Sequence, residues 1–98
     1  MIPYEERRAV YEEAIATYGI ERQIMMAVEE MAELTKELAK SFRPGGTTLE
    51  KLVDEIADVT IMVEQLRLGF DANQRVQDRI DYKVQRLAKR LEEAKRNA

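Results

Sequence analysis

Apolar residues recur every three or four positions along four stretches of this chain, and short segments rich in polar residues or glycine separate the stretches. This period is typical of amphipathic helices, because residues three or four apart lie on one face of a helix. Gly19 ends the first stretch, and either Thr47 or Thr48 is expected to cap the third. The pattern predicts helices over about residues 3–18, 21–41, 48–68 and 73–95.

The apolar stripe of each predicted helix is expected to face a shared core. We therefore predict an all-α fold: one domain over residues 1–98, a four-helix bundle-like protomer with an antiparallel central hairpin. Residues 56–63 are apolar on nearly all sides, which predicts assembly into a homodimer or homotetramer through the second and third helices. The predicted stripes are Val10, Tyr11, Ala14, Ile15 and Tyr18; Ile24, Ala27, Val28, Met31, Leu34, Thr35, Leu38 and Phe42; Leu49, Leu52, Val53, Ile56, Thr60 and Val63; Val76, Ile80, Val84, Leu87 and Leu91.

The composition excludes several kinds of chemistry. The chain has no cysteine, so it can form neither disulfides nor thiolate nucleophiles. It has no histidine, which excludes Ser-His and Cys-His nucleophile pairs, the histidine ligands of di-iron helical bundles and most zinc sites. Any metal must therefore be bound by oxygen atoms, which favours Mg²⁺ or Mn²⁺.

Charge is distributed unevenly within a net charge of −3. Residues 1–74 hold 8 basic and 15 acidic side chains, a net of −7, whereas residues 75–98 hold 8 basic and 4 acidic side chains, a net of +4. An acidic body argues against binding of a nucleic-acid polymer. No apolar run is long enough to cross a bilayer and the N-terminal residues do not resemble a signal peptide, so we expect no membrane partner and a cytoplasmic location.

Four acids form two pairs spaced i, i+3: Glu30 with Glu33, and Glu55 with Asp58. Each pair lies on one helix face, and the pairs stand at nearly equal distances from the turn between the two helices. An antiparallel hairpin would bring all four carboxylates to one level. A helical wheel allows these two acidic faces either to converge on one cleft or to diverge. A simpler interpretation is a solvated acidic surface, which is common in helices rich in glutamate.

Asp58 favours the metal interpretation, because it is the only charged residue between Ile56 and Val63. A partly buried carboxylate beside other acids destabilises a fold unless a cation offsets the charge. We therefore expect Mg²⁺, or Mn²⁺ in its place, among these acids. Glu37 and Lys51 also fall at one level on the hairpin and are expected to pair with each other.

The segment Glu29-Glu30-Met31-Ala32-Glu33, followed by Glu55-Ile56-Ala57-Asp58, resembles the E-E-x-x-E … E-x-x-D signature of the MazG-like all-α nucleoside triphosphate pyrophosphohydrolases. The resemblance covers roughly residues 24–90 and includes the order of the helices. It implies that Mg²⁺ is bound by Glu30, Glu33, Glu55 and Asp58. It places Glu29 beside the site, as a group that orients the ligands.

A basic stripe follows the fourth predicted helix, formed by Arg75, Arg79, Lys83, Arg86 and Arg90. Such a stripe can be a solvent-facing surface or a phosphate-binding surface. The family resemblance implies phosphate contacts for Lys83 and Arg86. Many relatives have asparagine four residues after this lysine, whereas this chain has Leu87.

Together these features predict an Mg²⁺-dependent hydrolase that converts a nucleoside triphosphate to the monophosphate and pyrophosphate. Glu30 or Glu33 would accept the proton of the attacking water. One alternative is a non-catalytic oligomerisation or regulatory module that binds metal or nucleotide. A phosphoribosyl-ATP pyrophosphatase-like enzyme ranks lower, because those enzymes usually carry a Tyr-His pair after the second motif.

Overall fold

Four helices and no strands make up the computed structural model, which describes all 98 residues and confirms the all-α prediction. The helix bounds agree with the predicted ones to within one or two residues. No helix is both long enough and apolar enough to cross a membrane. The helices are α1 (Tyr4–Tyr18), α2 (Ile20–Lys40), α3 (Leu49–Gly69) and α4 (Asn73–Arg96).

Local interactions explain where the helices begin and end. The Thr48 hydroxyl accepts a hydrogen bond from the backbone N–H of Lys51 (3.2 Å), so Thr48 is the N-cap of α3. Between α2 and α3, the loop folds back so tightly that the carbonyl oxygen of Lys40 occupies the place of a Cβ atom at Gly46. Asp71 joins α3 to α4 in the left-handed conformation (φ 51°), which aspartate tolerates better than most residues. The Thr48 cap, the tight loop and the turn at Asp71 set where α2 and α3 begin and end. They therefore also set how far along each helix the acids lie from the loop.

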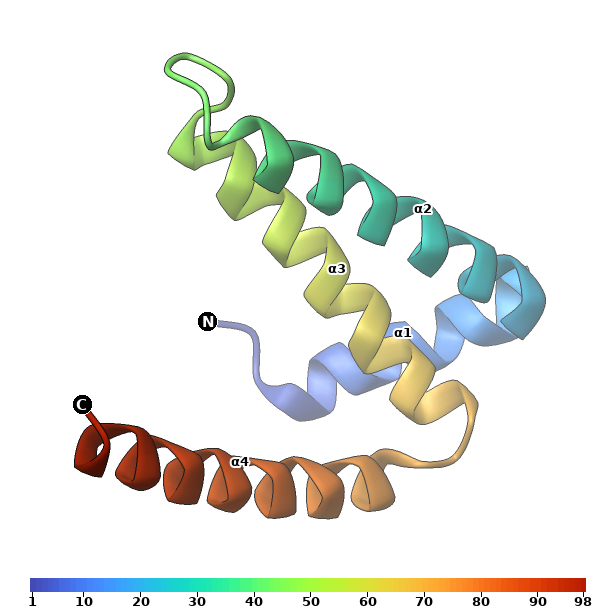
Figure 1. The fold of residues 1–98 in the computed structure, drawn as a ribbon. Helices are drawn as coiled ribbons and strands as arrows, with labels where there is room; N and C mark the ends of the chain where they lie inside the picture. Colours follow the sequence, from blue (N-terminus) through green and yellow to red (C-terminus); the bar gives the residue numbers. More distant parts are fainter.

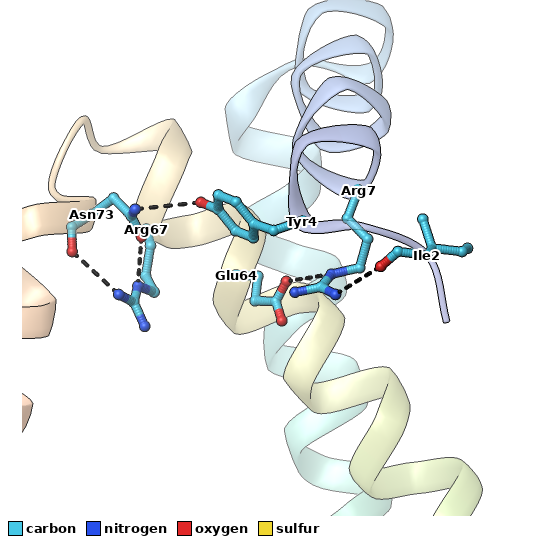
Figure 2. Close-up of polar contacts among 6 residues, drawn as sticks. All are labelled: Ile2, Tyr4, Arg7, Glu64, Arg67 and Asn73. Atoms are coloured by element: carbon cyan, nitrogen blue, oxygen red, sulfur yellow. Dashed lines mark hydrogen bonds and ion pairs between the residues drawn. The ribbon is translucent and has the colours of Figure 1, made fainter.

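Helices α2 and α3 lie side by side and are joined by the loop at one end of the pair, whereas α1 passes across the other end (Figure 1). The backbone of α4 approaches only α3, and the helix extends away from the rest of the chain (Figure 1). At their junction, the Arg67 guanidinium and the Tyr4 hydroxyl are hydrogen-bonded to Asn73 (Figure 2). The protomer is therefore a three-helix body with one loosely attached helix.

The interior of this body is small and unexpectedly polar. Only seven residues are buried, and just three of them are apolar, namely Tyr11, Ala27 and Met62. Near one end of the α2–α3 pair, the side-chain amide of Gln23 donates a 2.7 Å hydrogen bond to the carbonyl oxygen of Gln65. A small alanine and a matched amide pair let the two helices approach closely without leaving these amides unpaired.

The predicted core faces are only partly correct for the protomer: Tyr11 and Ala27 are buried, and Ile24, Leu34 and Leu52 are half-buried. The covered sides of α2 and α3 mix polar and apolar residues, and the rest of each apolar stripe is exposed. One pair of helices covers only one face of each member, and α1 crosses the pair at one end alone. The exposed stripe residues are Val28, Met31 and Leu38 of α2, Leu49, Val53, Ile56 and Val63 of α3, and Ile80, Val84, Leu87 and Leu91 of α4.

The dimensions of the protomer agree with this open arrangement. A compact monomer of 11.4 kDa exposes about 5,800 Å² by the usual scaling with mass, whereas this chain exposes 7872 Å². Its radius of gyration is 16.9 Å, against about 13 Å for a compact domain of this length. The isolated chain thus leaves about 2,000 Å² more surface in contact with water than a compact protein does.

Candidate metal centre

Three carboxylates converge where α2 and α3 lie side by side. Glu30 comes from α2, and Glu55 and Asp58 come from consecutive turns of α3; one oxygen atom from each lies within 4.8 Å of the others. The spacing of three residues places Glu55 and Asp58 on one face of α3. The close packing of the pair brings Glu30 to the same level. The two acidic faces therefore converge rather than diverge.

The three carboxylates differ in burial: Asp58 is exposed, contrary to the expectation that it is partly buried, Glu30 is half-buried, and Glu55 is the most buried. Its side chain is only 9% exposed, and its Oε2 atom is buried without a hydrogen-bond partner. A buried carboxylate oxygen with no partner is costly, because it has lost its hydration and gained nothing in return. A hard divalent cation satisfies such an oxygen directly, and carboxylates are ligands that Mg²⁺ and Mn²⁺ accept. The residues present therefore fit a divalent cation.

The electrostatics of Glu30 point to the same need for positive charge. Its pKa is raised by burial and then by the negative charges of Asp58, Glu55, Glu33 and Glu29. The three ion pairs of the chain all lie elsewhere, and none includes a member of the group. The chain itself therefore supplies no counter-ion for this cluster.

The other two acids predicted for the site lie at its edge. Glu33 is exposed and stands outside the three-carboxylate group, although its charge contributes to the raised pKa of Glu30. Glu29 is also exposed and contributes least among these four acids. The structure thus brings three of the four predicted ligands together, and the roles of Glu33 and Glu29 stay predictions.

The predicted phosphate-binding residues are not brought to the carboxylates within one chain. Lys83 and Arg86 are exposed on α4, whose backbone approaches α3 but not α2. They also line different surface hollows, Lys83 beside Phe70 and Arg86 beside Tyr82. Their contact with phosphate stays a prediction, and it would need α4 of another copy or a different placement of α4.

The expected pairing of Glu37 with Lys51 is wrong. Glu37 is only 2% exposed and accepts hydrogen bonds from the Thr47 hydroxyl (2.8 Å) and the Lys40 ammonium (3.1 Å). The Thr47 bond and then the Lys40 bond lower the pKa of Glu37, and the charge of Lys51 is the smallest contribution. The loop turns back far enough to bring Thr47 closer than Lys51. Glu37 therefore stabilises the loop through Thr47 and is not part of the three-carboxylate group.

Sequence reasoning also missed the Gln23–Gln65 pair and the polar contacts of Arg67. Neither has a local signal, because the partners are brought together by the packing of different helices. Comparison with known proteins adds no assignment: no family model matches the chain, and no curated protein or solved structure matches it. The functional argument depends on the geometry of the acids and on the resemblance of their motifs.

Proposed function

We propose that this chain is an Mg²⁺-dependent nucleoside triphosphate pyrophosphohydrolase that releases a monophosphate and pyrophosphate. The observation that carries the proposal is the convergence of Glu30, Glu55 and Asp58 around a buried, unpartnered oxygen of Glu55. That geometry supports a divalent cation. The motif resemblance described above supplies the substrate class and the site of cleavage.

In this proposal Glu30, Glu55 and Asp58 hold the cation, and Glu33 completes the ligand set from the edge of the group. When bound, Mg²⁺ would lower the pKa of a coordinated water and offset charge on the phosphate oxygens. Glu30 or Glu33 accepts the proton of the attacking water, and Glu29 orients its neighbours. The partial burial of the group strengthens its attraction for cations, because the local dielectric is lower than that of water.

The proposed active form is a homodimer or homotetramer in which α2 and α3 act as an antiparallel hairpin. The exposed apolar stripes of these helices support it, and so does the excess exposed surface of about 2,000 Å² per chain. Covering that surface on two chains would bury about 4,000 Å², within the range of obligate dimers. In such an assembly, Lys83 and Arg86 of one copy reach the carboxylates of the other and bind the phosphates.

Pyrophosphate release from a panel of nucleoside triphosphates, measured with and without Mg²⁺, tests the proposal. Glu55→Gln removes one charge from the group and is expected to lower kcat by at least about 100-fold. Glu50→Gln is the matched control, because Glu50 is exposed in the first turn of α3 and outside the group. Equal activity of the two variants, or activity without any divalent ion, would exclude the proposed site.

A second candidate is a non-catalytic module that binds metal or nucleotide. It is favoured by Leu87, which stands where many of the enzymes that it resembles have asparagine, and by the separation of Lys83 and Arg86 from the acids. If the chain is such a module, it binds Mn²⁺ but releases no pyrophosphate from any nucleotide. Calorimetry with Mn²⁺, run beside the activity panel, separates the two candidates.

A further inference from the structure

A second polar cavity lies at the junction of α1, α3 and α4, away from the acidic group. It measures about 290 Å³, close to the lower end of the size range of small-molecule pockets. Five of its six lining residues are polar or charged, and Figure 2 draws the polar contacts among most of them. The lining residues are Tyr4, Arg7, Glu64, Arg67, Asn73 and Gln77.

Arg67 is held rigidly at one side of this cavity. Its Nε donates to the side-chain oxygen of Asn73 (2.8 Å), and its Nη2 donates to the Asn73 carbonyl oxygen (3.2 Å) and to Gln77 Oε1 (3.3 Å). All three acceptors are neutral, and no carboxylate lies within ion-pair distance of Arg67. Its Nη1 has no hydrogen-bond partner. The cavity thus contains a fixed positive charge without a counter-ion.

Arg7 supplies a second guanidinium from α1. Its Nε pairs with Glu64 Oε2 (3.3 Å) and its Nη1 donates to the Ile2 carbonyl oxygen (3.4 Å), while the guanidinium lies over the Tyr4 ring and beside the Tyr11 hydroxyl (Figure 2). Glu64 is already engaged by Arg7, and its neighbour Tyr11 has a pKa raised by burial and by this carboxylate. The lining therefore has two guanidinium groups against one carboxylate, a net charge of +1.

We propose that this cavity is a binding site for a small oxyanion of the phosphate type, held between Arg67 and Arg7. Guanidinium groups fixed by other hydrogen bonds bind oxyanions well, because little side-chain entropy is lost on binding. The free Nη1 of Arg67 donates to the anion, Arg7 adds a second positive charge, and the anion neutralises the net charge of the lining. The proposal does not depend on the proposed hydrolase activity.

Binding here has a consequence for α4. No residue of α4 is buried, and the polar contacts that tie it to the rest of the chain all involve Asn73 or Gln77. An anion bound by Arg67 of α3 and Arg7 of α1 lies against these same two residues. It adds hydrogen bonds across the joint, so α4 becomes more firmly attached when the site is filled.

The test is a titration of the ¹⁵N-labelled full chain with inorganic phosphate, in EDTA and at constant ionic strength. We expect saturable shifts in the side-chain ¹⁵N signals of Arg67, Asn73 and Gln77. We expect no shift in the backbone amide signal of Glu55. Arg67→Gln is expected to weaken phosphate binding by at least about tenfold, as is Arg7→Gln, which leaves the bonds between Arg67 and α4 intact. Arg22→Gln is the matched control, because Arg22 lies on α2 outside the cavity and changes net charge equally.

A nucleoside monophosphate titrated in parallel distinguishes the two sources of the anion. Tighter binding of the nucleotide, with added shifts at Tyr4, assigns the site to a nucleotide phosphate, and equal affinities assign it to free phosphate. The proposal is overturned if both arginine variants bind phosphate as well as Arg22→Gln does. It is equally overturned if the shifts appear along the basic stripe of α4 instead, or if sodium chloride reproduces them.

Discussion

Helices α2 and α4 have similarly amphipathic sequences, yet α2 is packed against α3 whereas α4 is packed against almost nothing. The α2–α3 pair buries four polar residues, Gln23, Glu37, Glu55 and Gln65, beside Ala27 and Met62, and it exposes much of its apolar stripes. Helix α4 buries neither side. The comparison teaches that apolar periodicity identifies the face that needs covering, whereas it does not identify the partner that covers it.

The difference follows from the neighbours that each helix has. Helices α2 and α3 pack on each other and on α1, so one side of each is covered, and Glu55 lies on the covered side of α3. Helix α4 approaches α3 alone, so its apolar stripe stays uncovered in the single chain. The candidate site and the exposed stripes therefore both depend on how α2 and α3 are paired.

The strongest test of this comparison places a charge on the exposed stripe of α3. Ile56→Asp is expected to destabilise the proposed assembly by about 3–5 kcal/mol, because an unpaired charge would be buried at the interface. Sedimentation equilibrium is then expected to show monomers of the variant at concentrations where the wild type forms the proposed homodimer or homotetramer. Asp54→Asn, an exposed position on the same helix, is the control and should leave the assembly unchanged.

The same charge on α4 shows which region forms the interface. If the α2–α3 stripes alone meet across the dimer, Leu87→Asp leaves the dissociation constant close to that of the wild type. A monomeric Leu87→Asp variant together with a dimeric Ile56→Asp variant would reverse the proposed roles of the two regions.

A divalent cation should stabilise the pair through its carboxylates. A ligand that binds only the folded state adds about 2.7 kcal/mol at 100 times its Kd, so Mg²⁺ or Mn²⁺ is expected to raise Tm. Glu55→Gln should abolish this rise, and Glu50→Gln should retain it. A wild-type Tm that responds to neither ion would contradict the presence of a metal site at these carboxylates.

The polar interior of the pair can be probed by comparing a buried glutamine, Gln65, with an exposed one, Gln74. Gln65→Ala leaves the buried amide of Gln23 unpaired and should cost about 1–3 kcal/mol in the free energy of unfolding. Gln74→Ala removes an exposed bond to Asp78 on α4 and should cost less than about 0.5 kcal/mol. Equal costs in chemical denaturation would mean that the two regions do not differ as described.

The smallest expected effect concerns the pH dependence of stability without metal. Because the folded-state pKa of Glu30 is raised, its contribution to stability is present below the unfolded pKa of about 4.5 and is lost as pH rises through the folded value. Glu30→Gln should therefore stabilise the EDTA-treated protein at pH 7 by about 0.5–1 kcal/mol. The gain should vanish near pH 4. A variant that is less stable than the wild type at pH 7 would contradict this sign.

Much of the fold could be predicted, because helix length and spacing are local properties. The i, i+3 spacing and the turn length predicted that Glu30, Glu33, Glu55 and Asp58 stand at one level; three of them converge, and Glu33 stands outside the group. The rotation of α2 about its axis was not predictable, because the wheel allowed converging or diverging faces. The buried Gln23–Gln65 bond settles this rotation, and it depends on two residues distant in sequence whose complementarity has no periodic signature.

The isolation of α4 has a practical consequence. This helix carries eight lysine and arginine residues between positions 75 and 96, and none of them is buried. Trypsin would therefore cleave it readily in a lone copy, leaving a core fragment of the first three helices. Resistance of the same peptide bonds at high protein concentration would reveal directly that another molecule shields them.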